Sequence, residues 1–198
     1  MKVPGKVDNL NPANILTFLR IALVPLYVWL FSLQQWYTVV IALIVFIVAA
    51  VTDLYDGRLA RSRKEITKLG KFLDPLADKF LVVGALAQFC VMGLVSVWLV
   101  SVIIIRDVWV TVMRIVAIAR GTELRTSRDA KVKTAIQLTA VITIIVFTGA
   151  RIIALKLGYS GPLIDPGGYR LFFNGLLSVA VLFTIYSWAG YLFRKKAA

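Results

Sequence analysis

The most informative stretch of this chain lies between residues 53 and 78. It reads Asp53-Leu-Tyr-Asp56-Gly57-Arg58-Leu-Ala60-Arg61 and, after eight further residues, Gly70-Lys-Phe-Leu-Asp74-Pro-Leu-Ala-Asp78. Apolar runs flank it on both sides, so four aspartates stand next to segments that are long enough to cross a membrane. An acidic side chain in a membrane helix costs roughly 2.5–3.5 kcal/mol and usually has a partner or a function. Because four carboxylates cannot neutralise one another, we expect cations between them.

The composition indicates a membrane protein. Of 198 residues, 60% are apolar and only 17% are charged, and the mean hydropathy is +0.83. A soluble domain would be nearer half apolar, with about a quarter of its residues charged. We therefore predict an all-α, polytopic membrane protein that forms a single membrane domain over residues 1–198.

Apolar runs of spanning length predict six transmembrane helices, because a helix needs about 20 apolar residues to cross the hydrocarbon core. We place them at residues 15–33, 37–55, 75–95, 97–117, 134–156 and 171–193. Residues 1–14 are too few for more than a short cytoplasmic or interfacial lead-in.

The basic residues predict the orientation of these helices. The net charge is +13, from 23 Lys and Arg against 10 Asp and Glu. Most of these cations follow the second and fourth predicted helices or lie near the two termini, which places both termini in the cytoplasm. Their positions favour anionic lipids and phosphorylated substrates over nucleic acid as partners. The segment 157–170, rich in Gly and Pro, is expected to be an irregular external loop, and its role is open.

Two residue types are nearly absent, and this excludes several kinds of chemistry. The chain has no histidine and one cysteine, Cys90. A Ser-His-Asp triad, a His-ligated zinc site and Cys-His catalysis are therefore excluded. Because Cys90 lies within an apolar run, we interpret it as a packing residue.

The spacing of the four aspartates predicts a site for divalent cations. Asp53 and Asp56 are three residues apart and Asp74 and Asp78 are four apart, so on helices each pair shares a face. Two adjacent antiparallel helices would bring the pairs together. Carboxylates without His or Cys suit magnesium, manganese or calcium, and four of them suit two ions better than one. The alternative is that they form ordinary ion pairs at the membrane surface.

Small residues follow the first aspartate pair. Gly57 and Ala60 leave one side of this stretch without bulk, so a large ligand could lie against the backbone. Arg61 would supply positive charge for a diphosphate. We assign no role to Arg58.

The complete pattern is Asp-x2-Asp-Gly-x2-Ala-Arg-x8-Gly-x3-Asp-x3-Asp, and residues 53–78 match it at every defined position. It resembles the signature of the CDP-alcohol phosphotransferase family. The resemblance implies six membrane helices, an active site that faces the cytosol and, commonly, a homodimer. It also implies a reaction in which an alcohol displaces CMP from a CDP-linked lipid or alcohol.

The resemblance also implies a role for each residue of the motif. Asp53, Asp56 and Asp74 would hold two divalent cations, Mg²⁺ or Mn²⁺. Asp78 would contact a cation and act as the general base on the incoming hydroxyl. The remaining members would contact the CDP moiety: Gly57, Ala60 and Arg61, together with Asp53.

Looser motifs point to the acceptor alcohol. They are Asn14-Ile-Leu-Thr17-Phe-Leu-Arg20, Arg106-Asp107 followed by Arg114, and Lys131-Val-Lys133-Thr134-Ala-Ile-Gln137. They resemble the bacterial phosphatidylglycerophosphate synthases, a branch of this family. This implies transfer of a phosphatidyl group from CDP-diacylglycerol to sn-glycerol 3-phosphate, with phosphatidylglycerophosphate and CMP as products, at the bacterial inner (cytoplasmic) membrane.

The basic residues of these looser motifs fit a phosphorylated acceptor, because a phosphate dianion needs a cationic pocket. We expect that pocket to comprise Arg106, Arg114, Lys131 and Lys133. Arg106 lies within an apolar run, which favours a functional role. Arg120, Arg125 and Arg128 are interpreted instead as membrane anchors on the cytoplasmic side.

Other functions stay open at this point. Within the family, the acceptor could be inositol phosphate, serine or phosphatidylglycerol. Outside it, membrane prenyltransferases also bind diphosphates through paired aspartates, although usually in longer chains with widely separated pairs. A divalent-cation transporter would carry its carboxylates at mid-membrane, whereas these lie beside a basic loop.

Overall fold

The computed structural model describes the backbone of residues 12–63, 68–119 and 128–195. Side chains are described over 19–52, 79–113, 115–116 and 132–187. The described backbone forms six α-helices and no strand, as expected for an all-α protein. They are α1 (Pro12–Ser32), α2 (Trp36–Arg63), α3 (Lys68–Val91), α4 (Val97–Ala119), α5 (Arg128–Lys156) and α6 (Pro166–Lys195).

The helices are longer than hydropathy predicted at several ends. The second helix continues to Arg63 rather than ending at 55, and the third begins at Lys68 rather than 75. At its other end the third helix is shorter than predicted, because it ends at Val91 rather than 95. The sixth begins at Pro166, which leaves a shorter loop than the expected 157–170. Hydropathy marks only the apolar part of a helix, whereas Leu, Arg and Lys are good helix formers that extend it into polar surroundings.

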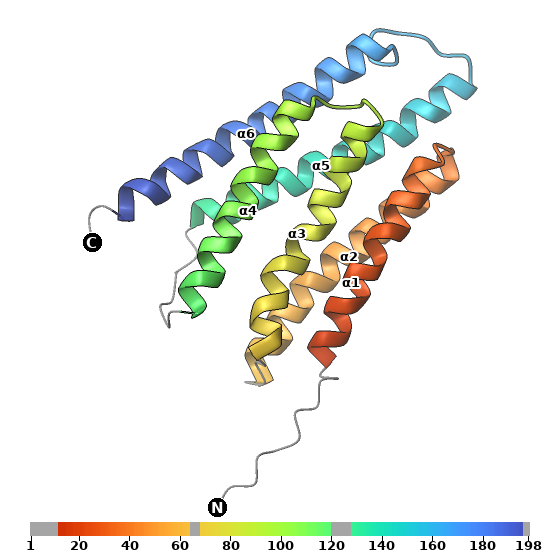
Figure 1. Ribbon diagram of the computed structural model, residues 1–198. Helices are drawn as coiled ribbons and strands as arrows, with labels where there is room; N and C mark the ends of the chain where they lie inside the picture. The colour runs from red at the N-terminus through yellow and green to blue at the C-terminus, as the bar shows by residue number, and fades with distance from the viewer. Residues whose placement is uncertain (1–11, 64–67, 120–127, 196–198) are drawn as a thin grey trace, which may run out of the picture.

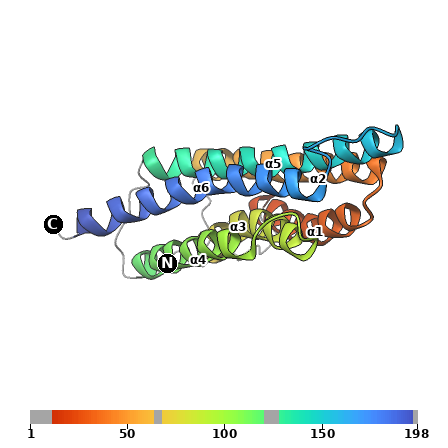
Figure 2. The ribbon, with the colours of Figure 1, turned by 90° about the horizontal axis from the view of Figure 1, so that it is seen from above.

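The six helices form a closed ring in which each contacts two neighbours. The order around the ring is α1, α2, α5, α6, α4 and α3, and α3 also contacts α2 and α5. Seen from above, the ring is two rows: α2, α5 and α6 in one, and α1, α3 and α4 in the other (Figure 2). Helix α3 therefore adjoins four others and carries one of the aspartate pairs.

Successive helices run in opposite directions along the bundle (Figure 1). One end of the bundle, called here the site end, holds the starts of α1, α3 and α5 and the ends of α2, α4 and α6. The turns that join α1 to α2, α3 to α4 and α5 to α6 lie at the opposite end, called here the turn end. The basic segments predicted from the sequence all adjoin the site end.

Aromatic side chains fill the space between α1, α2 and α3. Tyr27 and Phe31 of α1 stack at a centroid distance of 5.7 Å, and Phe46 of α2 and Phe89 of α3 each lie 5.5 Å from one of these two rings. All four are fully buried. Such ring pairs contribute about 0.5–1.5 kcal/mol beyond area burial, so they fix how α3 sits against α1 and α2.

A glycine allows α1 and α3 to approach closely. A β-carbon at Gly84 would lie 2.8 Å from Cγ1 of Val24. Small residues at helix contacts commonly permit this kind of close packing in membranes.

Side chains of α6 fix the turn between α3 and α4. Gly93 has φ +64°, a conformation that suits glycine because it has no β-carbon. Its carbonyl accepts a hydrogen bond of 2.6 Å from Nε of Arg170. The backbone N–H of Ser96 donates to Oδ1 of Asn174 at 2.7 Å. These hydrogen bonds connect α3, α4 and α6 at the turn end.

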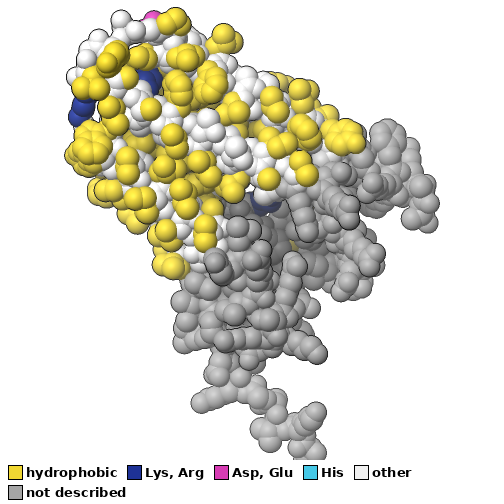
Figure 3. Space-filling model, turned by 180° about the vertical axis from the view of Figure 1, so that it is seen from behind, with side chains coloured by type: hydrophobic (Ala, Val, Ile, Leu, Met, Phe, Trp, Pro, Cys, Tyr) yellow, Lys and Arg dark blue, Asp and Glu magenta, His cyan; other side chains and the backbone are white. Residues whose placement is uncertain are grey.

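The outer surface of the bundle is strongly apolar. Figure 3 shows hydrophobic side chains over most of the described part of one face, with few charges. Large apolar residues such as Val91, Trp98, Leu171 and Leu182 are exposed. Contiguous apolar surface of this kind indicates contact with another apolar phase.

Two described segments are long and apolar enough to cross a membrane by length and composition, Val132–Lys156 and Pro166–Ser187. Shorter apolar helical stretches occur at Leu19–Ser32, Trp36–Thr52 and Lys79–Val91. The prediction of an all-helical protein is confirmed for the described residues, and two of its helices are candidate membrane spans. The number of spans and the side on which the termini lie stay predictions.

Candidate active site

The aspartate motif is distributed over two helices that contact each other. Asp53, Asp56, Gly57, Ala60 and Arg61 all lie on α2, because this helix continues to Arg63. Gly70, Asp74 and Asp78 lie on α3, which begins at Lys68. The helices α2 and α3 are in contact and antiparallel, and the motif occupies the part of each that leads to the site end (Figure 1).

The side chains of this motif lie outside the described residues, so its metal ligation stays a prediction. Among the side chains that the structure does describe, no group of three or more Asp, Glu, His or Cys residues could hold a metal ion. None of the four aspartates belongs to those described side chains.

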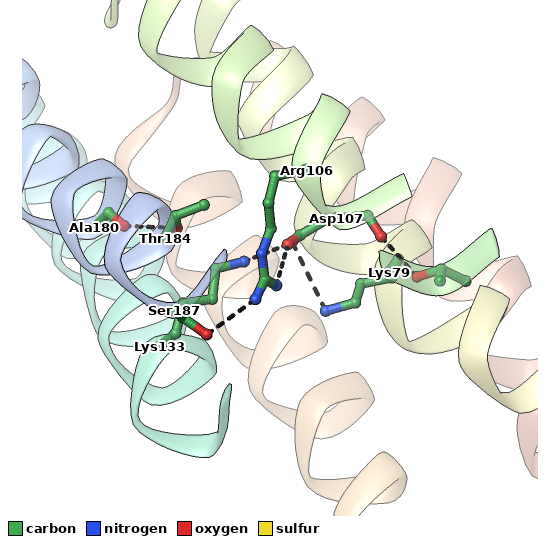
Figure 4. A network of polar contacts seen from close by, with 8 residues as sticks. Lys79, Arg106, Asp107, Lys133, Ala180, Thr184 and Ser187 are labelled. Carbon is green, nitrogen blue, oxygen red and sulfur yellow. Dashed lines mark hydrogen bonds and ion pairs between the residues drawn. The ribbon is translucent and has the colours of Figure 1, made fainter. Parts of the chain in front are cut away.

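A second cluster of charges lies inside the bundle, centred on Asp107 of α4 (Figure 4). The ammonium of Lys133 on α5 and the guanidinium of Arg106 both donate to its Oδ1, the latter at 3.2 Å. Nζ of Lys79 on α3 lies 3.7 Å from its Oδ2. We call these four residues the Asp107 cluster. It joins the three successive helices α3, α4 and α5.

The cluster is deeply buried. Asp107 is 2% exposed, Lys133 1% and Arg106 8%, whereas the Lys79 side chain is 31% exposed. Removing one partner of a buried ion pair typically costs about 3–5 kcal/mol, because it leaves an uncompensated charge. Loss of any one of these ion-pair partners is therefore expected to destabilise the fold.

Arg106 also reaches α6. One of its terminal nitrogens donates to Oγ of Ser187 at 3.1 Å. Its buried Nε has no hydrogen-bond partner among the described residues. The three cations of the cluster face a single carboxylate, so two positive charges are left without an anion within it.

The structure brings together only part of the predicted acceptor pocket. Arg106 and Lys133 meet at Asp107, as a shared role requires. Arg114 lies on α4 and Lys131 on α5, but their side chains are outside those described. Arg106 is buried rather than at the surface, and its role in binding the acceptor stays a prediction.

Three members of this region were not assigned a role from the sequence. Asp107 was part of a quoted motif, and its signal was an acidic residue within an apolar run. Lys79 directly follows Asp78. Ser187 gives no signal at all, because a serine in an apolar helix is common.

Comparison with known proteins identifies the family. A family model described as CDP-alcohol phosphatidyltransferase matches residues 10–188. The chain is 36% identical over 147 residues to a "Probable phosphatidylglycerophosphate synthase" of Mycobacterium tuberculosis, covering 71% of this chain and 68% of the relative.

Two further relatives carry the name CDP-diacylglycerol–glycerol-3-phosphate 3-phosphatidyltransferase. The Bacillus subtilis protein is 36% identical over 143 residues, covering 66% of this chain and 74% of the relative. The Escherichia coli K12 protein is 32% identical over 193 residues, covering 94% of this chain and 96% of the relative. The chain belongs to the CDP-alcohol phosphatidyltransferase family and is an enzyme, which confirms the resemblance seen in residues 53–78.

Proposed function

We propose that this protein transfers a phosphatidyl group from CDP-diacylglycerol to sn-glycerol 3-phosphate, giving phosphatidylglycerophosphate and CMP in phospholipid biosynthesis. The names of the relatives from Bacillus subtilis and Escherichia coli support this reaction. The observation that carries the choice of acceptor is the Asp107 cluster, because its positive charges exceed its negative charge and lie on helices that contact α3.

A phosphorylated acceptor accounts for this excess charge. Arg106 and Lys133 would bind the phosphate of glycerol 3-phosphate, joined by Arg114 and Lys131. Arginine offers planar pairs of donors and lysine a compact charge, and both bind phosphate well. Serine, which has no phosphate, would leave these buried cations without an anion.

The donor would lie against α2. Gly57 and Ala60 leave this part of the helix without large side chains, so the CDP moiety can approach the backbone there. Arg61 would pair with the diphosphate, and Asp53 would also contact this moiety. The helix brings these positions and Asp56 to the same end of the bundle.

Asp53, Asp56, Asp74 and Asp78 would hold two divalent cations, Mg²⁺ or Mn²⁺. The family generally uses divalent cations, and a donor set of carboxylates without His or Cys fits hard cations of this kind. Bound there, such ions supply positive charge that stabilises the diphosphate and the leaving group.

Asp78 would act as the general base. Its carboxylate would accept the proton of the 1-hydroxyl of glycerol 3-phosphate as that oxygen bonds to the lipid-side phosphorus. The bond between this phosphorus and the oxygen of CMP breaks, and CMP leaves. Asp78 is on α3 one residue before Lys79, which contacts Asp107, so the base and the acceptor phosphate site would adjoin each other.

The enzyme would be a single domain of six membrane helices in the bacterial inner membrane. Both termini and the active site would face the cytoplasm, where anionic lipids adjoin the basic segments at the site end. We also propose that it forms a homodimer, as the family resemblance implies.

The test is CMP release by the purified protein with CDP-diacylglycerol, Mg²⁺ and one acceptor at a time. Glycerol 3-phosphate should drive release, and glycerol, serine and inositol should not. Release with inositol phosphate or phosphatidylglycerol instead would keep the reaction class and replace the acceptor. The absence of release with every acceptor, from folded protein, would refute the proposed activity.

A further inference from the structure

Among the described side chains, the carboxylate of Asp107 is the one anion that contacts Lys79, Arg106 and Lys133, and these three cations come from three helices. Its Oδ1 accepts from both Lys133 and Arg106, and its Oδ2 faces Lys79. Arg106 is its neighbour in sequence, whereas Lys133 is 26 residues away. Asp107 is 2% exposed, so bulk water has almost no access to it.

The cations of the cluster keep donors that Asp107 does not use. Nε of Arg106 is buried and has no hydrogen-bond partner among the described residues. The ammonium of Lys133 has three N–H donors, and its hydrogen bond to the described residues is the one to Asp107. A structural ion pair is normally satisfied on all sides. The unpartnered Nε of Arg106, together with two positive charges that no described carboxylate balances, leads us to expect that a second anion completes the cluster.

We propose that Asp107 is a positioning residue, which holds Arg106 and Lys133 so that their remaining donors meet the phosphate of the acceptor. This rests on the proposed function, since it takes glycerol 3-phosphate to be the acceptor. Asp107 itself does not touch the substrate. It fixes the two cations, and Lys79 links this arrangement to α3, one residue after Asp78.

The alternative physical effect of Asp107 has the opposite sign. As an anion next to the cations, it also weakens their attraction for a phosphate, so its removal could tighten binding. Burial decides between the two effects. A buried ammonium that loses its counter-ion loses its proton or moves toward water, and either change removes it from the phosphate. We therefore expect removal of the Asp107 charge to weaken acceptor binding.

The decisive variant is Asp107→Asn, which keeps the size of the side chain and removes its charge. We expect the KM for glycerol 3-phosphate to rise about 10- to 100-fold, the range seen when a residue that orients binding groups is lost at a metal site. The KM for CDP-diacylglycerol should stay within about twofold of the wild-type value.

Two further variants separate positioning from folding. Thr111→Val is the matched control, because Thr111 is buried one turn along α4 and its hydroxyl donates to the backbone carbonyl of Asp107 without touching the cations. It should leave both KM values unchanged. Asp107→Glu keeps the charge but displaces it, so it should give an acceptor KM between those of the wild type and Asp107→Asn.

A double variant tests whether Asp107 acts through Lys133. If it does, adding Asp107→Asn to Lys133→Met should change the acceptor KM by much less than it does in the wild-type background, since contacting residues are not additive. If the two substitutions instead raise the acceptor KM by independent factors that multiply in the double variant, Asp107 does not act through Lys133.

Binding is measured in parallel as the rise in unfolding temperature that glycerol 3-phosphate gives the purified protein in detergent. Asp107→Asn should lose most of this rise. An unchanged or lower acceptor KM, or an equal change in both KM values, would overturn the inference. If Asp107→Asn does not fold, Asp107→Glu decides in the same way, and a wild-type acceptor KM in it overturns the inference.

The two hypotheses fail in different ways. If the wild-type protein does not use glycerol 3-phosphate, the proposed function fails and the inference fails with it. If the wild type uses it normally and Asp107→Asn binds it equally well, only the role of Asp107 is refuted.

Discussion

Lys133 of α5 donates a hydrogen bond to the carboxylate of Asp107 on α4, and both side chains are almost completely buried. In the ring of helices, α4 and α5 are not neighbours, and their backbones are not among those in close contact. A long polar side chain therefore bridges the interior of the bundle at the point where α3, α4 and α5 face one another (Figure 4).

Neutralising Lys133 should weaken acceptor binding. We expect Lys133→Met to raise the KM for glycerol 3-phosphate at least 30-fold, equivalent to about 2 kcal/mol, the lower limit for loss of a buried charged contact. Lys156→Met is the matched control, because Lys156 is exposed at the turn end of the same helix. Steady-state kinetics of CMP release measure both, and equal KM values in the two variants would contradict the assignment of Lys133.

Replacing the proposed base should abolish turnover. General base catalysis contributes about 10²- to 10⁴-fold, so Asp78→Asn should reduce kcat by at least about 100-fold. Asp165→Asn serves as the control, since Asp165 is exposed at the start of α6, at the turn end. Activity near the wild-type level in Asp78→Asn would exclude this residue as the base.

Removal of divalent cations should also abolish turnover. EDTA treatment is expected to stop CMP release, and excess Mg²⁺ or Mn²⁺ should restore it, because the four carboxylates of the proposed site would hold the ions reversibly. Asp56→Asn should raise the Mg²⁺ concentration required for half-maximal activity, since one ligand charge is lost. Turnover that persists in EDTA after dialysis would contradict a metal-dependent site.

A methyl group at Gly84 should loosen the contact between α1 and α3. Its β-carbon would lie 2.8 Å from Val24, a β-branched residue that adjusts poorly within a helix. We expect Gly84→Ala to lower the free energy of unfolding by about 1–3 kcal/mol. Gly175→Ala, whose β-carbon meets nothing within 4 Å, should be neutral or stabilising by up to about 1 kcal/mol.

Thermal unfolding in detergent compares the two glycine variants. Val24→Ala should restore most of the stability that Gly84→Ala loses, because it removes the clashing methyl groups. Equal unfolding temperatures for both single variants would show that α1 and α3 do not pack as closely as described.

The proposed topology can be tested with single cysteines in a Cys90→Ala background. Leu163, exposed at the turn end, should as Leu163→Cys react with a membrane-impermeant thiol reagent added to intact spheroplasts. Ala198→Cys should react only after the membrane is opened. Labelling of Ala198→Cys in intact cells would place the C-terminus outside and refute the proposed orientation.

The sequence alone determined the class of the protein and the location of its motif. Apolar runs and clustered charges are local properties, so they identified a helical membrane protein without reference to tertiary contacts. Spacings of three and four residues between aspartates are also local, because they fit one face of a helix. Helix ends were less accurate, as at Arg63, because polarity marks where the apolar part stops rather than where backbone hydrogen bonding stops.

Only the tertiary structure decided what Arg106 and Lys133 contact. The sequence indicated that both could bind a phosphate, but it could not show that Asp107 holds them, or that Lys79 and Ser187 join the same region. These contacts span up to 81 positions in the chain and depend on the order of helices around the ring. That order is set by the packing of whole helix faces, which the spacing of residues within any one helix does not encode.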